Sequence, residues 1–170
     1  FFYILIIPEN FKLANSEQIA AYVIINENIM LIKEEWFGYH EKTNTLGKVF
    51  IHEAGHLVDL PHTFDEGINP SSEIIKDTPC SHLSFSDKLF FLQEEDPINS
   101  DRKRPKDCSD NRTHQIENFM DYSGDQFTFI FTKGQKIVSD ELFEENGRLH
   151  NLYIEGTKQY KSLPKITNVT

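Results

Sequence analysis

The sequence has little of what several large classes of protein require. No hydrophobic run exceeds seven residues, whereas a transmembrane helix needs roughly 20, so we expect no membrane span. Basic residues are outnumbered, with 17 Lys and Arg against 27 Asp and Glu, and the net charge of −10 argues against a nucleic acid or an anionic membrane surface as partner. Internal repeats and low-complexity tracts are absent as well, which argues against a repeat architecture.

Cysteine is also scarce. Only Cys80 and Cys108 occur, and they fit a single disulfide that closes a long loop. Two sequons for N-glycosylation are present, Asn111-Arg112-Thr113 and Asn168-Val169-Thr170. Together these features favour a secreted or extracytoplasmic protein over a cytosolic one. The chain of 170 residues has the length of one domain, and its 14 Phe indicate a core built largely from aromatic rings.

Three short apolar segments predict a small sheet. The opening run Phe1 to Ile7 is expected to be a core strand rather than the remnant of a signal peptide, because it has no basic flank and no small-residue cleavage site. Tyr22 to Ile25 and Ile29 to Ile32 are rich in β-branched residues and enclose the polar turn Asn26-Glu27-Asn28. We expect these strands to form a sheet that supports the next element.

That element is predicted to be an amphipathic helix, because apolar residues recur every four positions from Thr45 onward. Thr43 or Asn44 is the expected N-cap. Asp59 followed by Pro61 is expected to end the helix. The apolar arc, which would pack on the sheet, consists of Leu46, Phe50, Ala54, Leu57 and Val58.

The helix carries the most informative pattern of the chain, His52-Glu53-Ala54-Gly55-His56, followed by His62. His52 and His56 lie one helical turn apart on one face, so both imidazoles can reach one ion at about 2.0–2.1 Å. Glu53 lies one position around the helix, where it is better placed to hold a water molecule and accept its proton. If His62 is the third ligand, the fourth position of a zinc ion stays open, as in catalytic rather than structural sites. The pattern predicts a zinc metallopeptidase.

Chance and structural zinc are the competing interpretations. With 7 His and 16 Glu, a bare His-Glu-x-x-His arises in about 3% of shuffled sequences, and requiring the third His lowers this to about 0.1%. A structural zinc site needs a fourth protein ligand, and neither cysteine is close in sequence. The remaining histidines share no ligand spacing and are expected at surface or loop positions: His40, His82, His114 and His150.

The chain after the motif is polar and irregular from Thr63 to about Asn118. A loop of this length in a compact domain is usually functional or stapled, and the disulfide between Cys80 and Cys108 would be the staple. Ca²⁺ is compatible with the acidic loops, but no ligand pattern assigns residues to it. Thr132-Lys133-Gly134-Gln135 matches a capping box, and Ile137, Val138 and Leu142 predict a helix from there to about Glu145. No clear element is expected beyond Asn146.

A second motif makes a family resemblance specific. The zinc motif is followed by Asp77-Thr78-Pro79, by Asn118-Phe119-Met120-Asp121-Tyr122-Ser123 and by Phe131-Thr132-Lys133-Gly134-Gln135. These segments occur in the order seen in pappalysin-type metzincins, and the chain resembles that family from roughly Gly47 to Gln135. The resemblance implies an α+β, metzincin-like catalytic domain, in which a small mixed sheet is backed by the active-site helix. Residues 1–62 would form the N-terminal subdomain, and 63–170 the C-terminal one.

The resemblance also implies roles for individual residues. Glu53 would be the general base and acid, and Met120 would form the apolar Met-turn beneath the metal. Tyr122 would stand near the zinc and donate to the oxyanion of the tetrahedral intermediate. Family members often prefer a basic residue just after the cleaved bond, and Asp125 is a candidate for the matching acid. The zinc ligands would be His52, His56 and His62.

One departure from the family pattern concerns the third ligand. The Gly between the second and third ligands is replaced by Asp59, at a position where the backbone bends through a left-handed conformation. Asp tolerates positive φ better than most residues, so we expect the turn to persist with some strain. The alternative function is a catalytically silent, metzincin-like module that binds proteins, against which the retention of Glu53 argues. The expected partner is a protein or peptide that lies as an extended strand along the sheet edge.

Overall fold

The computed structural model describes residues 2–11, 19–40, 45–64, 75–78 and 115–162. The predicted disulfide between Cys80 and Cys108, both sequons and the N-cap candidates Thr43 and Asn44 lie outside these residues, as do His82 and His114. None of the helices in these described segments is long and apolar enough to cross a membrane.

A three-stranded mixed sheet forms the N-terminal part of the chain. It contains β1 (Tyr3–Ile7), β2 (Ala21–Ile24) and β3 (Ile29–Lys33) in the order β1-β3-β2. β1 runs parallel to β3, and β2 runs antiparallel to it. The 3₁₀ turn η1 (Ile25–Glu27) joins β2 to β3 and ends at Asn28, which has a φ of 55°. The predicted mixed sheet is thus present, and its central strand carries the fully buried Met30 and Ile32.

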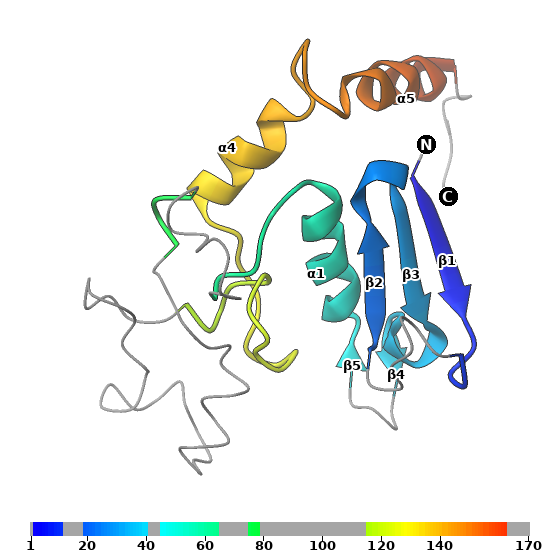
Figure 1. The fold of residues 1–170 in the computed structure, drawn as a ribbon, viewed down its shortest axis with the longest axis vertical. Coiled ribbons are helices and arrows are strands. Elements are labelled where there is room, and N and C mark those ends of the chain that lie inside the picture. Colours follow the sequence, from blue (N-terminus) through cyan, green and yellow to red (C-terminus); the bar gives the residue numbers. More distant parts are fainter. Residues whose placement is uncertain (1, 12–18, 41–44, 65–74, 79–114, 163–170) are drawn as a thin grey trace, which may run out of the picture.

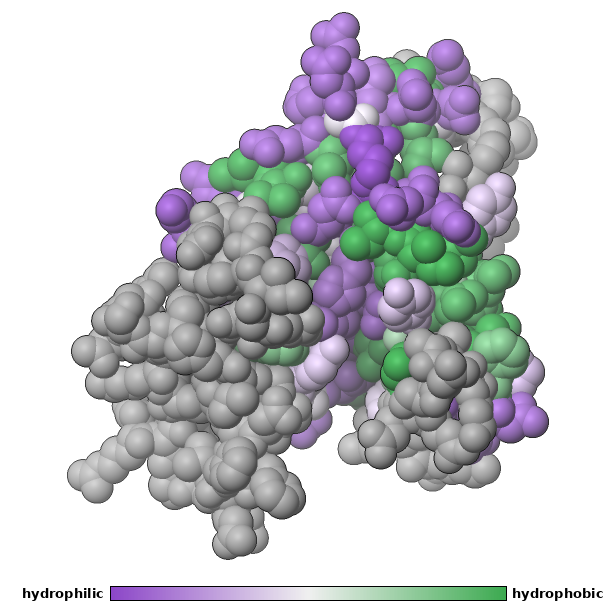
Figure 2. All heavy atoms as spheres, in the orientation of Figure 1, coloured by the Kyte–Doolittle hydropathy of each residue, from purple (hydrophilic) through white to green (hydrophobic). Residues whose placement is uncertain are grey.

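The expectation that the first strand belongs to the core is wrong. Tyr3, Ile4, Leu5 and Ile6 are between 45% and 54% exposed. β1 is an edge strand, and the helix that covers the sheet contacts mainly β2 and β3 (Figure 1). On the face shown in Figure 2, hydrophobic residues accordingly gather over the strands of the sheet, while hydrophilic residues cover the link between the last two helices.

The helix that covers the sheet is α1 (Lys48–Leu57). It begins three residues after Thr45, because Thr45 and Leu46 form β5 (Thr45–Leu46), which pairs with β4 (Tyr39–His40) after the 3₁₀ turn η2 (Glu34–Trp36). The N-cap is Gly47 at a φ of 78°, not Thr43 or Asn44. A Cβ atom at Gly47 would lie 3.0 Å from the Cα of Gly38, so both the conformation and the packing require Gly.

The described residues of the C-terminal part contain two helices. The first, α4 (Lys133–Glu141), confirms the predicted capping box: the Thr132 side chain accepts from the Gln135 N–H, and the Gln135 side chain accepts from the Thr132 N–H. Asp77 adds a second cap, because its Oδ2 accepts from the Gly134 N–H at 2.8 Å. The second helix, α5 (His150–Ser162), was not predicted. A small core of Leu60, Ile75 and Met120, with Val58 and Val138 packed against it, joins α4 to the end of α1.

Candidate metal centre and active site

Three imidazoles meet beside α1. Its residues His52 and His56 lie one turn apart, and His62 follows five residues after the helix ends. The Nε2 atom of His52 lies 3.1 Å from that of His56 and 3.1 Å from that of His62, and the remaining pair is 3.0 Å apart. Three nitrogens at this separation can all lie about 2.0–2.1 Å from one ion, which fits zinc. The structure therefore brings together the three residues that the spacing predicted.

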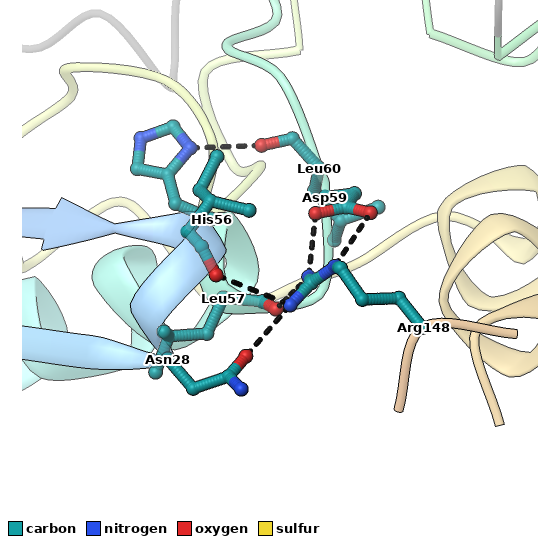
Figure 3. Close-up of polar contacts among 7 residues, drawn as sticks. Asn28, His56, Leu57, Asp59, Leu60 and Arg148 are labelled. Atoms are coloured by element: carbon teal, nitrogen blue, oxygen red, sulfur yellow. Dashed lines mark hydrogen bonds and ion pairs between the residues drawn. The ribbon is translucent and has the colours of Figure 1, made fainter. Parts of the chain in front are cut away.

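Hydrogen bonds on the opposite side of two rings fix their orientation. Nδ1 of His52 lies 2.6 Å from the Phe119 carbonyl oxygen. Nδ1 of His56 lies 2.8 Å from the Leu60 carbonyl oxygen, a contact drawn in Figure 3. A carbonyl oxygen only accepts, so each Nδ1 carries the proton and each Nε2 presents its lone pair to the shared point. This is the arrangement that metal-binding histidines need.

The charge state of the rings suits the same purpose. Burial first, and then the neighbouring imidazoles, lower the pKa of His52 from 6.5 to about 3. Burial and His56 lower the pKa of His62 to about 3 as well. Neutral imidazoles bind metals and imidazolium does not, so both rings are ready to ligate at physiological pH.

Within the described segments, no fourth protein ligand completes the group. Among the described residues, His52, His56 and His62 form a group of potential ligand atoms that no further His, Cys, Asp or Glu joins. Glu53, although adjacent to His52 in sequence, stands outside the group. A metal held by three imidazoles keeps a position for a water or substrate molecule, which is the catalytic type of site.

A tight turn after α1 returns the chain toward the metal centre. The Asp59 N–H donates to the His56 carbonyl oxygen and the Leu60 N–H to the Gly55 carbonyl oxygen, both at 3.0 Å. Asp59 has a φ of 59°, which confirms the left-handed conformation expected at this position. The turn thereby sets both the Leu60 carbonyl that orients His56 and the path of the chain to His62.

Met120 is fully buried, and its role as the floor beneath the metal stays a prediction. Its carbonyl oxygen accepts from the Thr63 N–H at 3.1 Å, next to His62 in sequence. A Cβ atom at Gly55 would lie 2.3 Å from the Met120 sulfur, so the absence of a side chain at Gly55 lets Met120 approach α1. The Phe119 carbonyl of the same segment holds His52.

A buried pair of amides supports this segment. The Asn118 and Gln135 side chains, 0% and 1% exposed, exchange two hydrogen bonds of 2.9 and 3.0 Å. Asn118 Oδ1 also accepts from the Met120 N–H at 2.9 Å. Gln135, which caps α4, therefore also fixes the backbone at Met120 through Asn118.

Glu53 and Tyr122 line a cleft of about 680 Å³ beside the histidines. Glu53 is only 9% exposed, and burial raises the pKa of its carboxyl from 4.5 to about 7. Tyr122 is 49% exposed, and the centroid of its ring lies 4.7 Å from that of His62. The carboxyl of Glu53 and the hydroxyl of Tyr122 thus belong to the same cleft as His52.

Asp125 lines this cleft too, but its carboxylate already has partners in the backbone. Its Oδ2 accepts from the Leu46 N–H at 2.7 Å and from the Lys48 N–H at 3.3 Å. Lys48 is the first residue of α1, where a negative charge also complements the helix dipole. Asp125 therefore fastens the start of α1, a role that the sequence did not indicate.

Comparison with known proteins identifies the family. Residues 15–142 match the sequence model of Peptidase_M43, described as pregnancy-associated plasma protein-A. The chain belongs to this family. Curated relatives include an extracellular metalloprotease of Pyricularia oryzae, 33% identical over 100 residues, and one of Verticillium alfalfae, 38% identical over 90 residues. The aligned parts are 59% and 53% of this chain, but only 31% and 28% of those relatives, so this M43 family member spans about a third of their length.

Solved structures bear out the fold. Mature mirolysin of Tannerella forsythia, in complex with a cleaved peptide, superposes with a TM-score of 0.62 at 20% identity, covering 84% of this chain and 54% of mirolysin. Mirolysin in complex with compound 9 gives a TM-score of 0.65 at 21% identity, covering 82% and 54%. The predicted α+β, metzincin-like fold and the resemblance to pappalysin-type metzincins are confirmed.

Several residues that shape the site of this M43 family member were not singled out from the sequence. Asn118 and Gly55 lie inside recognised motifs, but the motifs did not predict which residues they contact. Gln135 was predicted only as a helix cap, although its amide also faces Asn118. Arg148 contacts Asp59 from 89 residues further along the chain, and no local sequence pattern predicts a pair so far apart.

The amide pair yields a stability prediction. Asn118→Ala should lower the free energy of unfolding by roughly 2–4 kcal/mol, because it leaves the Gln135 amide and the Met120 N–H buried without their partner. Urea denaturation of the metal-free protein measures the change. The exposed Gln126→Ala is the matched control and should change it by less than about 0.5 kcal/mol. Equal values for the two variants would contradict the assigned role.

Proposed function

We propose that this chain is the catalytic part of a zinc-dependent endopeptidase that hydrolyses peptide bonds in proteins or peptides. The observation that carries the proposal is the convergence of three imidazole Nε2 atoms, 3.0–3.1 Å apart, next to a buried carboxylate that stands outside the ligand group. A zinc ion held by His52, His56 and His62 would supply a Lewis acid that polarises the scissile carbonyl and lowers the pKa of water. Family membership supports the same chemistry.

In this proposal Glu53 moves the proton. Its carboxylate takes a proton from the attacking water and passes it to the nitrogen of the leaving amine, so no covalent intermediate is needed. Burial places its pKa at about 7, close to the working pH at which proton exchange in both directions is most efficient. Tyr122, half-exposed in the same cleft, donates its hydroxyl to the oxyanion that forms at the carbonyl carbon.

The substrate is proposed to bind as an extended strand along the edge of β2 that pairs with no other strand in the described residues. β2 is the terminal strand on this side of the three-stranded sheet, and Ala21 at its start lines the same cleft as His52 and Glu53. Main-chain hydrogen bonds to this edge would supply affinity without strong dependence on sequence. A preference for a basic residue would come from Asp125, although its Oδ2 is engaged by the start of α1.

We also propose a secreted location. The curated relatives carry the name extracellular metalloprotease. The two cysteines and two sequons of the sequence favour the same compartment.

Cleavage of a quenched peptide library tests the proposed function. The purified protein, loaded with zinc, should cut a subset of the peptides, and a zinc chelator should abolish the cutting until zinc, but not calcium, is restored. If the protein binds one zinc per chain yet cuts nothing, the silent binding module takes the place of the peptidase. If it cuts equally well in the chelator, the metal mechanism is wrong.

A further inference from the structure

The turn that carries the third histidine contains a residue in an unfavourable conformation. Asp59 lies between His56 and His62 with a φ of 59°, a region that Gly adopts readily and most other residues avoid. In the described part of the chain, Asn28 is the one other non-Gly residue with positive φ. Both of these residues contact the same side chain, that of Arg148.

Arg148 reaches this turn from the segment between α4 and α5 (Figures 1 and 3). Its Nη2 donates to Asp59 Oδ1 at 2.6 Å, and its Nε lies 3.4 Å from Asp59 Oδ2, so the guanidinium faces both oxygens of the carboxylate. The exposed fractions of the two side chains are 27% for Arg148 and 35% for Asp59, so water only partly screens the pair.

The same guanidinium also holds the end of α1. Leu57 is the last residue of the helix, and its carbonyl oxygen accepts a hydrogen bond of 2.7 Å from Nη2. A helix leaves its last carbonyls without intrahelical donors and carries partial negative charge there, so a cation is favoured. On its other side, Nη1 donates to Asn28 Oδ1 at 2.7 Å and to the Ile25 carbonyl oxygen at 3.3 Å. Arg148 thus ties the β2–β3 connection to the end of the active-site helix.

We propose that Arg148 is a positioning residue for the metal centre, which acts through Asp59. By binding the carboxylate of Asp59 and the adjacent Leu57 carbonyl, it stabilises the left-handed turn in the geometry that brings His62 to the other two histidines. The inference rests on the proposed function only in that the three histidines must hold zinc.

The turn positions two of the three ligands, His56 and His62, so its loss would lower the affinity for the metal. The Leu60 carbonyl oxygen, one residue after Asp59, lies 2.8 Å from Nδ1 of His56. His62 follows two residues later. If the turn relaxes, His56 loses the partner that sets its tautomer and His62 is displaced. Partners of this outer kind typically contribute about 10–100-fold to metal affinity.

The pair predicts a specific coupling between two substitutions. Arg148→Met removes the guanidinium but keeps much of the apolar stem, and should weaken zinc binding about 10–100-fold. In an Asp59→Gly background the backbone adopts positive φ without help, so the same Arg148→Met change should weaken binding less than about threefold. Arg148→Lys keeps the charge without the planar fork and should fall between.

Zinc affinity, measured by competition with a chromogenic chelator, is the test, with circular dichroism used to choose a temperature at which every variant is fully folded. The absorption of the Co²⁺-loaded protein reports the coordination geometry independently of activity. Lys136→Met is the matched control, because it removes a cation from an exposed ion pair on α4 and should leave zinc affinity unchanged.

The possible outcomes separate this inference from the proposed function. Equal losses on Arg148→Met in the unmodified protein and in the Asp59→Gly background would overturn the positioning role, and so would unchanged affinity in both. If Arg148→Met lowers the thermal stability of the metal-free protein without changing zinc affinity or the Co²⁺ spectrum, Arg148 is merely structural and the inference is wrong. If the unmodified protein binds no zinc, the inference and the proposed function fall together, whereas tight zinc binding without peptide cleavage removes only the latter.

Discussion

Glu53→Gln is expected to reduce peptide hydrolysis at least about 10²–10⁴-fold, the usual contribution of a general base, while leaving zinc binding intact. Gln has nearly the same size and shape as Glu, but its amide cannot accept and return a proton at neutral pH. Because Glu53 stands outside the group of three histidines, its replacement should not disturb the ligands. The kcat/KM for a cleavable peptide and the zinc content after dialysis measure the two effects.

The control for this variant is Glu27→Gln, which makes the same chemical change at an exposed position of the η1 turn. Its kcat/KM should stay within about twofold of the unmodified protein. A Glu53→Gln variant that keeps more than about a tenth of the activity would show that another group takes the proton. A variant that loses zinc as well would indicate that Glu53 supports the metal rather than the proton transfer.

The features of this molecule that could be predicted from its sequence are those determined by residues close together in the chain. The His52 and His56 pair depends on one helical turn, and the capping box of α4 depends on Thr132 and Gln135, three residues apart. The left-handed conformation of Asp59 could be expected because the residue lies between a helix and a ligand that must turn back. In each case a few neighbouring residues contain the whole physical reason.

The parts that could not be predicted depend on partners distant in sequence. α1 begins at Lys48 rather than near Thr45 because Gly47 packs against the Gly38 backbone, a contact that hydrophobic periodicity does not reveal. Whether β1 is buried depends on which strands α1 covers, and it covers mainly β2 and β3. α5 was missed because its apolar residues are sparse and Gly156 interrupts the pattern.

The same limit applies to the site. The sequence predicted three ligands and the carboxylate, but not what orients them, because the Phe119 carbonyl, the Asn118 and Gln135 amides and Arg148 all act across long separations in sequence. The residues expected to bind the metal and transfer the proton lie in recognisable motifs, whereas many of the residues that orient them do not.

His62→Ala is expected to weaken zinc binding by more than about 100-fold, beyond the loss that an orienting partner causes, and to abolish hydrolysis. His62 supplies one of the three Nε2 atoms, and the two that remain, on His52 and His56, lie 3.1 Å apart on one helix and would leave the metal with only two protein ligands. Equilibrium dialysis gives the zinc affinity, and the Co²⁺ spectrum reports the change in coordination. His150→Gln, which alters a histidine outside the cluster, should leave both unchanged.

A loss of packing has to be separated from this loss of a ligand, because the His62 ring also stacks on Phe64 with 4.6 Å between centroids. His62→Phe keeps an aromatic ring for that stack and removes both nitrogens. If the ligand role is correct, His62→Phe binds zinc as weakly as His62→Ala although its metal-free form is more stable to heat. If His62→Phe instead restores tight zinc binding, the third ligand lies elsewhere, and the turn through Asp59 serves the fold rather than the metal.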